Sequence, residues 1–360
     1  MIICRRKNIT FMKSRTKKYI LVSIILIFLL SIFLYLYNHY KRTSLSLSHT
    51  HPVKTVNKQK VKVSIDNNPL GENIYICDSK NNRIIEVNPQ KKIIWQMTGI
   101  QDPDDVQVYA SNRLIINQEN YSRVIEINTQ TKKIVWSYGH LGVPGDTTGY
   151  LGEYVDDSFR LMNGNTLITD DVNMRSIAVN RKGQIVWQYG HTGIRSNMPG
   201  YLNAPNDSMP IPGGSILITN IGNHMAIDVN PSNNTILWQV NIPQLYPSDA
   251  VPLPNGNILS TDWVYPGKIQ EITKTGQVVW TYQPQGADTL NHPSSTQLLP
   301  NGNYLIVDDH NDRVFVLNPV TKKILWQYGI TGKAGIGANM LNDPSGVALA
   351  TPMISPAFVK

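Results

Sequence analysis

The feature that most constrains the fold of this chain is a tryptophan that returns six times within the same short phrase. "NPVTKKILWQYG" at 318–329 closely matches "NTQTKKIVWSYG" at 128–139, and four weaker copies share the same pattern. Successive tryptophans are 41, 51, 51, 42 and 46 residues apart, which is the length of one four-stranded propeller blade. The six are Trp95, Trp136, Trp187, Trp238, Trp280 and Trp326.

Each repeat contains four short apolar runs. The unit at 292–329 holds "STQLL", "YLIVDD", "VFVLN" and "ILWQYG", and the breaks between them are rich in Gly, Pro, Asn and Asp. Such runs, joined by tight turns, predict a four-stranded antiparallel blade. Five complete units end at the second to sixth of the tryptophans.

The sixth unit is divided between the two ends of the repeat region. Its outer three strands are predicted in "NIYICD", "RIIEVN" and "KIIWQM", whereas its inner strand is predicted in "LNDPSGVALA" at 341–350, which aligns with "LNHPSSTQLL" at 290–299. Closure of this kind protects the edges of an open ring. The sequence therefore predicts an all-β, six-bladed propeller over 69–352, with the C-terminal strand completing the first blade.

Two recurring motifs are predicted to be architectural. A tryptophan on the outermost strand is expected to pack against the neighbouring blade. The pattern D-x-x-N-x-R is expected to form a turn at a strand end, where the Asp and Asn side chains satisfy backbone amides and the arginine pairs with a neighbour. It occurs at Asp78/Asn81/Arg83, Asp170/Asn173/Arg175 and Asp308/Asn311/Arg313.

The N-terminal part indicates a membrane anchor. Residues 1–18 are basic, and 19–37 are nineteen residues without a charge, long enough for one transmembrane helix. Basic residues stay on the cytoplasmic side, and no small-residue cleavage site comes after the apolar run. We expect a single-pass signal anchor, a flexible stalk over 38–68, the propeller outside the cell membrane and a tail over 353–360.

The net charge of +8 does not indicate a nucleic-acid partner. Residues 1–42 contain nine of the 33 Lys and Arg residues and none of the 25 Asp and Glu residues. The remainder is therefore close to neutral and lacks the basic surface that nucleic acids require.

Several motifs resemble known repeat families. "TKKILWQY" resembles the tryptophan docking motif of pyrroloquinoline-quinone-like propellers, and "LNDPSGVAL" with D-x-x-N-x-R resembles the NHL repeat. "LLPNGNYLIVDDHNDRVFVLNPVTKKILWQYG" is most similar to the arylsulfotransferase-like propellers. The resemblance covers nearly all of 70–352 and implies the fold more strongly than any function.

The same resemblance bears on cofactor and chemistry. Quinone-dependent relatives usually have eight blades and often an adjacent-cysteine disulfide over the cofactor. Six units, with Cys77 as the one cysteine of the predicted propeller, argue against bound quinone. Arylsulfotransferases use a central histidine, and their blades tend to begin with a histidine before aspartate. The corresponding starts here read "DD", "DD", "ND", "SD" and "SS", so the family's nucleophile cannot be assigned to a residue of this chain.

One column of residues is predicted at the mouth of the central channel, at the start of the inner strands. The carboxylates either cap backbone amides at their own strand starts, or converge to bind a hard cation such as Ca²⁺, or a cationic or polyol ligand. The column consists of Asp105, Asp157, Asp207, Asp249 and Ser295, with Gly346 as the sixth position.

His292 and Arg160 are the candidate catalytic residues. His292 precedes an inner strand by three residues and is the histidine best placed to act as nucleophile or general base; a solvated loop histidine is the alternative. Arg160 is the single charged residue further along the inner strands, where it can also serve to balance the aspartates.

Two classes of function fit these observations. The first is a membrane-anchored extracellular propeller that binds a small-molecule, glycan or protein ligand or acts as a scaffold. The alternative is an arylsulfotransferase-like transferase that moves a sulfuryl group between phenolic compounds. The sequence leaves open whether the protein is an enzyme.

Overall fold

The computed structural model describes residues 68–353. The predicted basic segment, signal anchor, most of the stalk and most of the tail lie outside this range. Within it the helices are single 3-10 turns of three residues, and none has the length and apolar character needed to cross a bilayer.

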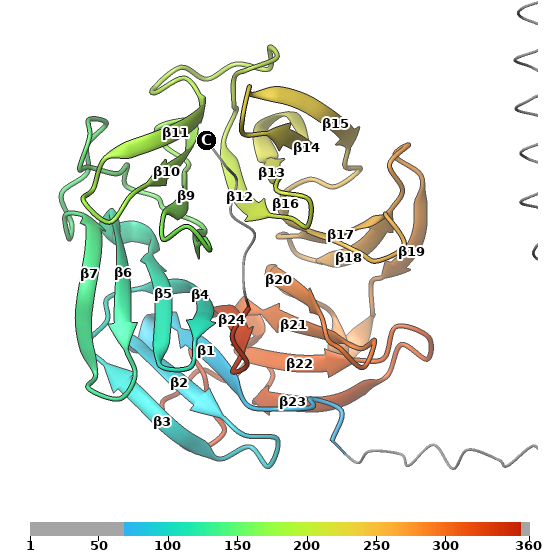
Figure 1. The fold of residues 1–360 in the computed structure, drawn as a ribbon. Coiled ribbons are helices and arrows are strands. Elements are labelled where there is room, and N and C mark those ends of the chain that lie inside the picture. Colours follow the sequence, from blue (N-terminus) through green and yellow to red (C-terminus); the bar gives the residue numbers. More distant parts are fainter. Residues whose placement is uncertain (1–67, 354–360) are drawn as a thin grey trace, which may run out of the picture. The chain divides into compact units, whose positions relative to one another are not determined.

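Six four-stranded antiparallel sheets are arranged as blades around a central axis (Figure 1), which confirms the predicted six-bladed propeller. The six inner strands are β4 (Pro103–Ala110), β8 (Ser158–Arg160), β12 (Pro205–Pro210), β16 (Pro247–Pro252), β20 (Pro293–Leu298) and β24 (Pro344–Leu349). The second strands are β1 (Ile74–Asp78), β5 (Arg113–Gln118), β9 (Thr166–Asp170), β13 (Ile216–Asn220), β17 (Ile258–Asp262) and β21 (Tyr304–Asp308).

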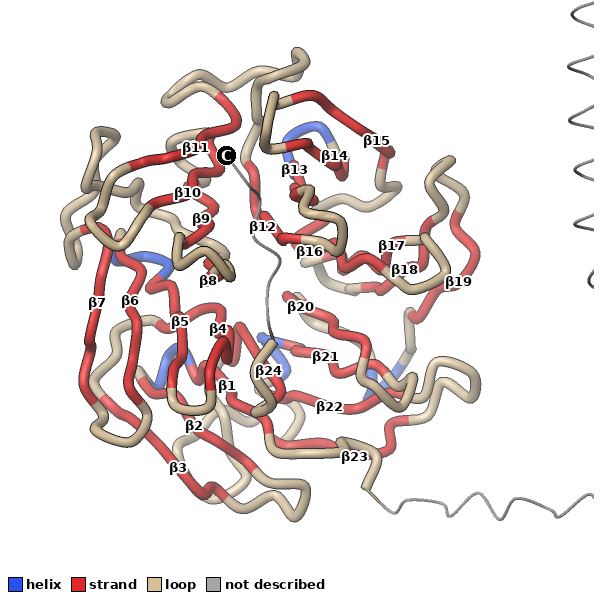
Figure 2. Tube along the Cα trace, viewed as in Figure 1, coloured by secondary structure: helices blue, strands red, loops and turns tan. Residues whose placement is uncertain are grey.

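The outer half of each blade keeps the same order. The third strands are β2 (Arg83–Val87), β6 (Arg123–Asn128), β10 (Arg175–Val179), β14 (Met225–Asn230), β18 (Lys268–Ile272) and β22 (Arg313–Leu317). The outermost strands are β3 (Ile93–Thr98), β7 (Lys133–Gly139), β11 (Ile185–Gly190), β15 (Thr235–Asn241), β19 (Val278–Tyr282) and β23 (Ile324–Gly329). Figure 2 shows that loops join these strands with only a few short helical turns between them.

The first blade is closed by the last strand. β24 pairs antiparallel with β1, with Ile76 opposite Val347 and Asp78 opposite Pro344, so the order within this sheet is β24-β1-β2-β3. In Figure 1 the red β24 lies directly beside the blue β1. The predicted closure is therefore confirmed.

The apolar core consists of six clusters, and each cluster lies between two neighbouring blades. Side chains alternate along β1 because successive residues of a strand face opposite sides of the sheet. Ile74 and Ile76 pack toward the sixth blade, whereas Tyr75 and Cys77 pack toward the second. Both faces of a blade are thus buried, which explains the nearly continuous apolar runs of the middle strands.

Each of the six repeated tryptophans docks onto the next blade, as predicted. The indole N–H donates a hydrogen bond of 2.8–3.3 Å to the turn between the third and fourth strands of that blade. The donor and acceptor residues are Trp95 and Thr129, Trp136 and Arg181, Trp187 and Asn234, Trp238 and Lys274, Trp280 and Pro319, and Trp326 and Pro89.

Trp326→Ala should destabilise the propeller more than Trp238→Ala. Trp326 is 7% exposed and belongs to the cluster that seals the first blade to the sixth, whereas Trp238 only borders its cluster. Truncating a buried aromatic costs about 3–5 kcal/mol, and the half-buried indole should cost less. Urea unfolding of both variants checks this, and equal losses would contradict the docking role assigned to Trp326.

The D-x-x-N-x-R motif joins each strand end to the loop that enters its blade. Arg313 Nε and Asn311 Nδ2 lie 2.8 and 2.9 Å from Asp308 Oδ2, and Asp308 Oδ1 accepts from the amide of Asn291 at 2.8 Å. The role predicted for aspartate is confirmed. The asparagine, however, donates to the carbonyl of Thr289 and to the aspartate because the incoming loop presents an oxygen to it and not an amide.

Candidate functional site

The inner strands carry a local irregularity where they enter the channel. Five of the six begin at a proline and have a register shift, a β-bulge, immediately after it. A bulge inserts an extra residue and changes the direction of the side chains there. Two consecutive residues therefore line the channel together, as in Asp104 with Asp105 and Ser248 with Asp249.

A cavity of about 1290 Å³ is lined by residues from all six inner strands. The strand starts are acidic and polar, and the strand ends are mostly apolar. Two residues beyond the aspartate column, a second tier lines the cavity in every blade. It consists of Gln107, Phe159, Met209, Val251, Gln297 and Ala348.

The four predicted aspartates form a continuous row of carboxyl groups. Each carboxyl group of the row perturbs the pKa of its neighbours, from Asp105 through Asp157 and Asp207 to Asp249. Asp249 Oδ2 also accepts from the amide of Thr296 on the next blade at 3.0 Å. Neighbouring carboxylates disfavour one another's charged form, so the row favours protonation when no cation is present.

Burial governs the ionisation of the row. It raises the pKa of Asp105 to about 7 and that of Asp207 to about 6. Burial and the neighbouring carboxylates raise the pKa of Asp157 and Asp249 well above the usual range. The row therefore exchanges protons near neutral pH.

A further set of acids surrounds the mouth above the row. Asp309 accepts hydrogen bonds from Ser294 Oγ at 2.6 Å and from Trp263 Nε1 at 3.1 Å. Burial raises the pKa of Asp309 well above its usual range. Burial and the charge of Asp102 raise the pKa of Glu119 to about 7. Sequence reasoning missed Glu119 and Asp309, although each comes directly after the polar residue that ends a second strand.

Aromatic and imidazole rings occupy one side of the mouth. Tyr246 and Trp263 have ring centroids 5.2 Å apart, Trp263 and His292 4.6 Å, and His292 and His310 4.2 Å. These four residues belong to the fifth and sixth blades, whereas most of the mouth's carboxyl groups belong to the first three. The mouth therefore has an aromatic side and an acidic side.

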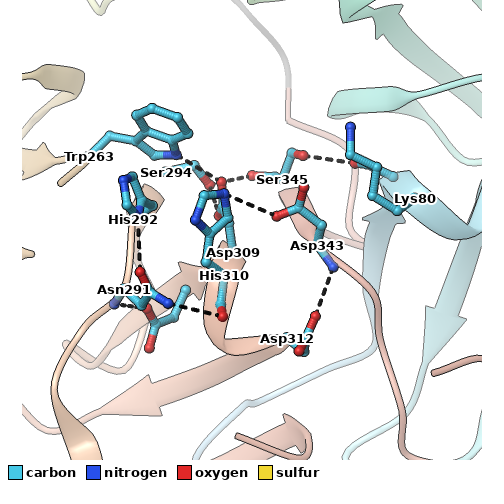
Figure 3. Close-up of polar contacts among 12 residues, drawn as sticks. Lys80, Trp263, Asn291, His292, Ser294, Asp309, His310, Asp312, Asp343 and Ser345 are labelled. Atoms are coloured by element: carbon cyan, nitrogen blue, oxygen red, sulfur yellow. Dashed lines mark hydrogen bonds and ion pairs between the residues drawn. The ribbon is translucent and has the colours of Figure 1, made fainter. Parts of the chain in front are cut away.

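The two histidines are held in place by polar neighbours, as Figure 3 shows. His292 Nδ1 lies 2.9 Å from Asn291 Oδ1, and His310 Nε2 lies 3.7 Å from Asp343 Oδ1. Burial and His310 lower the pKa of His292. His292 also has a left-handed backbone with φ of 53°, which projects its ring beside Trp263.

The repeat region of the chain matches a known protein family. Residues 161–350, just over half of the chain, match the family model described as outer membrane protein assembly factor BamB. The chain belongs to this family. As a BamB-type propeller it is built from PQQ-like repeats; this match does not show the resemblance to arylsulfotransferases.

Solved structures share the fold of this BamB-type propeller at low identity. A protein of unknown function from Bacteroides caccae is 16% identical, with a TM-score of 0.56, and the match covers 77% of this chain and 97% of that one. A catalytically inactive virginiamycin B lyase from Staphylococcus aureus, solved with quinupristin, is 13% identical with a TM-score of 0.47, covering 68% and 76%. No curated protein matches the chain.

In this BamB-type propeller, the other residues predicted from the sequence lie at different ends of the channel. Ser295 lies in the cavity wall with the aspartates. His292 lies at the mouth, but Arg160 lies at the opposite end of its inner strand and pairs with Glu126 at 2.9 Å. The structure therefore does not bring His292 and Arg160 together. Among residues 68–353, no group of three or more His, Cys, Asp or Glu has an arrangement suited to a metal ion.

Proposed function

We propose that this protein is a ligand-binding propeller whose ligand is an organic amine held at the acidic mouth of the channel. The observation that carries the proposal is the charge of the cavity wall. Among residues 68–353, eleven Asp and Glu residues line the cavity, and Lys80 is the one Lys or Arg that does so. Lys80 is itself paired with Asp102 at 3.3 Å. Such a wall concentrates cations in the channel.

The two sides of the mouth support an amine over a simple inorganic ion. Carboxylates such as Glu119 and Asp104 accept hydrogen bonds from an ammonium group, and these charge-assisted bonds are strong. Tyr246 and Trp263 on the other side offer aromatic rings, which attract cations and cover apolar surface. An organic cation uses both sides at once.

The second tier indicates which kind of group the amine carries. Phe159, Met209 and Val251 are consecutive around the channel, directly below the aspartate row. An alkyl or aryl group attached to the amine would move out of water and into contact with this apolar wall. Affinity should therefore rise about fourfold for each methylene group added.

Hexylamine should bind and raise the melting temperature, whereas hexanol and hexanoate should not. A ligand that binds only the folded state stabilises it by RT ln(1 + [L]/Kd). Glu119→Gln removes a charge at the mouth and should weaken hexylamine about tenfold, the usual effect of losing one charge-assisted hydrogen bond. Calorimetry at fixed pH measures both, with the exposed Glu153→Gln as the matched control.

Other outcomes would point to other ligands. Equal binding of hexylamine and hexanol would contradict the role of the carboxylates. A saturable stabilisation by Ca²⁺, lost in Asp157→Asn with Asp249→Asn, would favour the cation site expected from the sequence. Tight binding of neutral sugars without amines would favour a polyol ligand.

Sulfuryl transfer is the weaker candidate for this cavity. An aryl sulfate is an anion, and the wall that it would enter is lined by carboxyl groups.

The proposed location, outside the cell and anchored through residues 19–37, rests on the charge pattern of the N-terminus. Protease added to intact cells should release a fragment of propeller size if that orientation holds.

A further inference from the structure

A cluster of three arginines lies at the opposite end of the channel from the acidic mouth. All three pair with the carboxylate of Glu126 on β6. Arg160 Nη2 lies 2.9 Å from Glu126 Oε2, Arg113 Nε lies 3.3 Å from Glu126 Oε1, and Arg181 Nη1 also contacts Oε2. The cluster joins the second blade to the third, because Glu126 and Arg113 belong to one and Arg160 and Arg181 to the other.

The charges of this cluster do not cancel. Glu126 is ionised, because hydrogen bonds from Tyr109 and Arg181 and the charge of Arg160 lower its pKa although burial opposes this. One carboxylate thus faces three guanidinium groups. No other acidic side chain between residues 68 and 353 forms an ion pair with these arginines. The cluster therefore carries two more positive charges than its carboxylate neutralises.

The guanidinium groups are fixed before any ligand arrives. The guanidinium carbons of Arg160 and Arg181 lie 4.6 and 5.7 Å from the ring centroid of Trp136. Arg160 also donates to the carbonyl of Gly164 at 2.9 Å. Stacked, restrained arginines lose little freedom when they bind an anion, and their planar fork matches oxyanions.

A separate cavity adjoins the cluster. It has a volume of about 500 Å³, and its wall contains Arg160 and Arg181 together with Tyr109, Met162 and Met353. Arg160 is only 4% exposed, and its Nε–H is buried without a hydrogen-bond partner among the described residues. A buried donor without an acceptor is unfavourable. An oxygen-rich anion in the cavity would supply a hydrogen-bond acceptor for this Nε–H and negative charge for the arginines.

We propose that this cavity binds a phosphate group carried by a small organic molecule. The two uncompensated charges match a doubly charged oxyanion, and paired guanidinium groups hold such groups with charge-assisted hydrogen bonds. Tyr109, Met162 and Met353 provide apolar surface for the organic part. The site shares no carboxylate with the acidic mouth and does not depend on the amine proposal.

Phenyl phosphate and inorganic phosphate test the site by calorimetry at constant ionic strength. We expect saturable binding of both, tighter for phenyl phosphate. Arg181→Gln should weaken both about tenfold or more, because one charge-assisted contact is lost, and Arg181→Lys should recover part of the affinity. Arg181 is about half exposed, so the variants should fold. Lys182→Gln, in the same turn, is the control for general surface charge.

The proposal is overturned if Arg181→Gln and Lys182→Gln weaken phosphate equally, since this would indicate only nonspecific attraction. It is also overturned if wild-type protein binds neither probe at millimolar concentration. Binding of phenol as tight as that of phenyl phosphate would contradict the oxyanion role of the arginines. The melting temperature of each variant without ligand verifies that the fold is intact.

Discussion

A chain ended at Gly337 should fail to fold cooperatively. It would lack β24, so the inner edge of β1 would lose its partner strand and the apolar cluster between the first and sixth blades would lose Leu341 and Val347. An exposed strand edge beside an open apolar face promotes aggregation. We expect a protein that aggregates or melts far below the full chain, as measured by scanning calorimetry and light scattering.

A full-length variant separates closure from chain length. Val347 is fully buried, so Val347→Asp should cost more than about 4 kcal/mol by placing a charge in the seam. Val320 is 88% exposed, and Val320→Asp should change stability by less than about 0.5 kcal/mol. A truncated protein that melts like the full chain would disprove that the ring depends on its last strand.

The propeller without a bound cation should lose stability as the pH rises from about 5 to about 8. Mainly through burial, the pKa is about 7 for Asp105 and Glu119 and about 6 for Asp207, compared with ordinary values of 3.8 for Asp and 4.5 for Glu. The folded chain therefore holds more protons than the unfolded chain between these values. This stabilisation is complete below the unfolded pKa and is lost as the pH passes the folded pKa.

The expected change is large enough to measure. Each unit of pKa difference corresponds to about 1.4 kcal/mol, and a loss of about 3 kcal/mol would lower the melting temperature by roughly 5–10 °C. His292 has the opposite sign, because its pKa is lowered, but it is one partly exposed group. Hexylamine should restore stability at the higher pH, since a cation favours the deprotonated row.

Asp207→Asn provides the critical comparison. The amide keeps the shape of the carboxyl group but cannot ionise, so the variant should be more stable than the wild type at high pH and should show a flatter pH profile. Glu153→Gln removes an exposed carboxylate outside the cavity and should keep the wild-type profile. A melting temperature that rises with pH in the wild type would contradict the assigned ionisation of the row.

The fold could be predicted because its determinants are local and repeated. The spacing of the tryptophans reports the blade length, and the likeness of "LNDPSG" to "LNHPSS" reports the closure, because equivalent strands need the same proline and turn at the same place. The aspartate row was found by counting back from each inner turn. That count works because the same number of residues separates the mouth from the inner turn in each blade.

The rest of the mouth was not predictable from the same pattern. The bulges place Asp104 and Ser248 in the wall beside their neighbours, yet a strict alternation of strand residues would turn them away. Glu119 and Trp263 reach the mouth from the position just after a second strand, where the repeat tolerates any side chain. The closed ring brings the six equivalent positions together at the mouth. This proximity cannot be read from the sequence of a single repeat.

The arrangement of the first blade also sets the order in which the molecule can be completed. Ser79 contacts Ser345 at 2.7 Å, and these residues are 266 positions apart in the chain. At a synthesis rate of about 5–20 residues per second, the inner edge of β1 waits roughly 10–50 s for its partner. The inner edge of the first propeller strand is therefore paired last, and during that interval this edge of β1 needs protection from other chains.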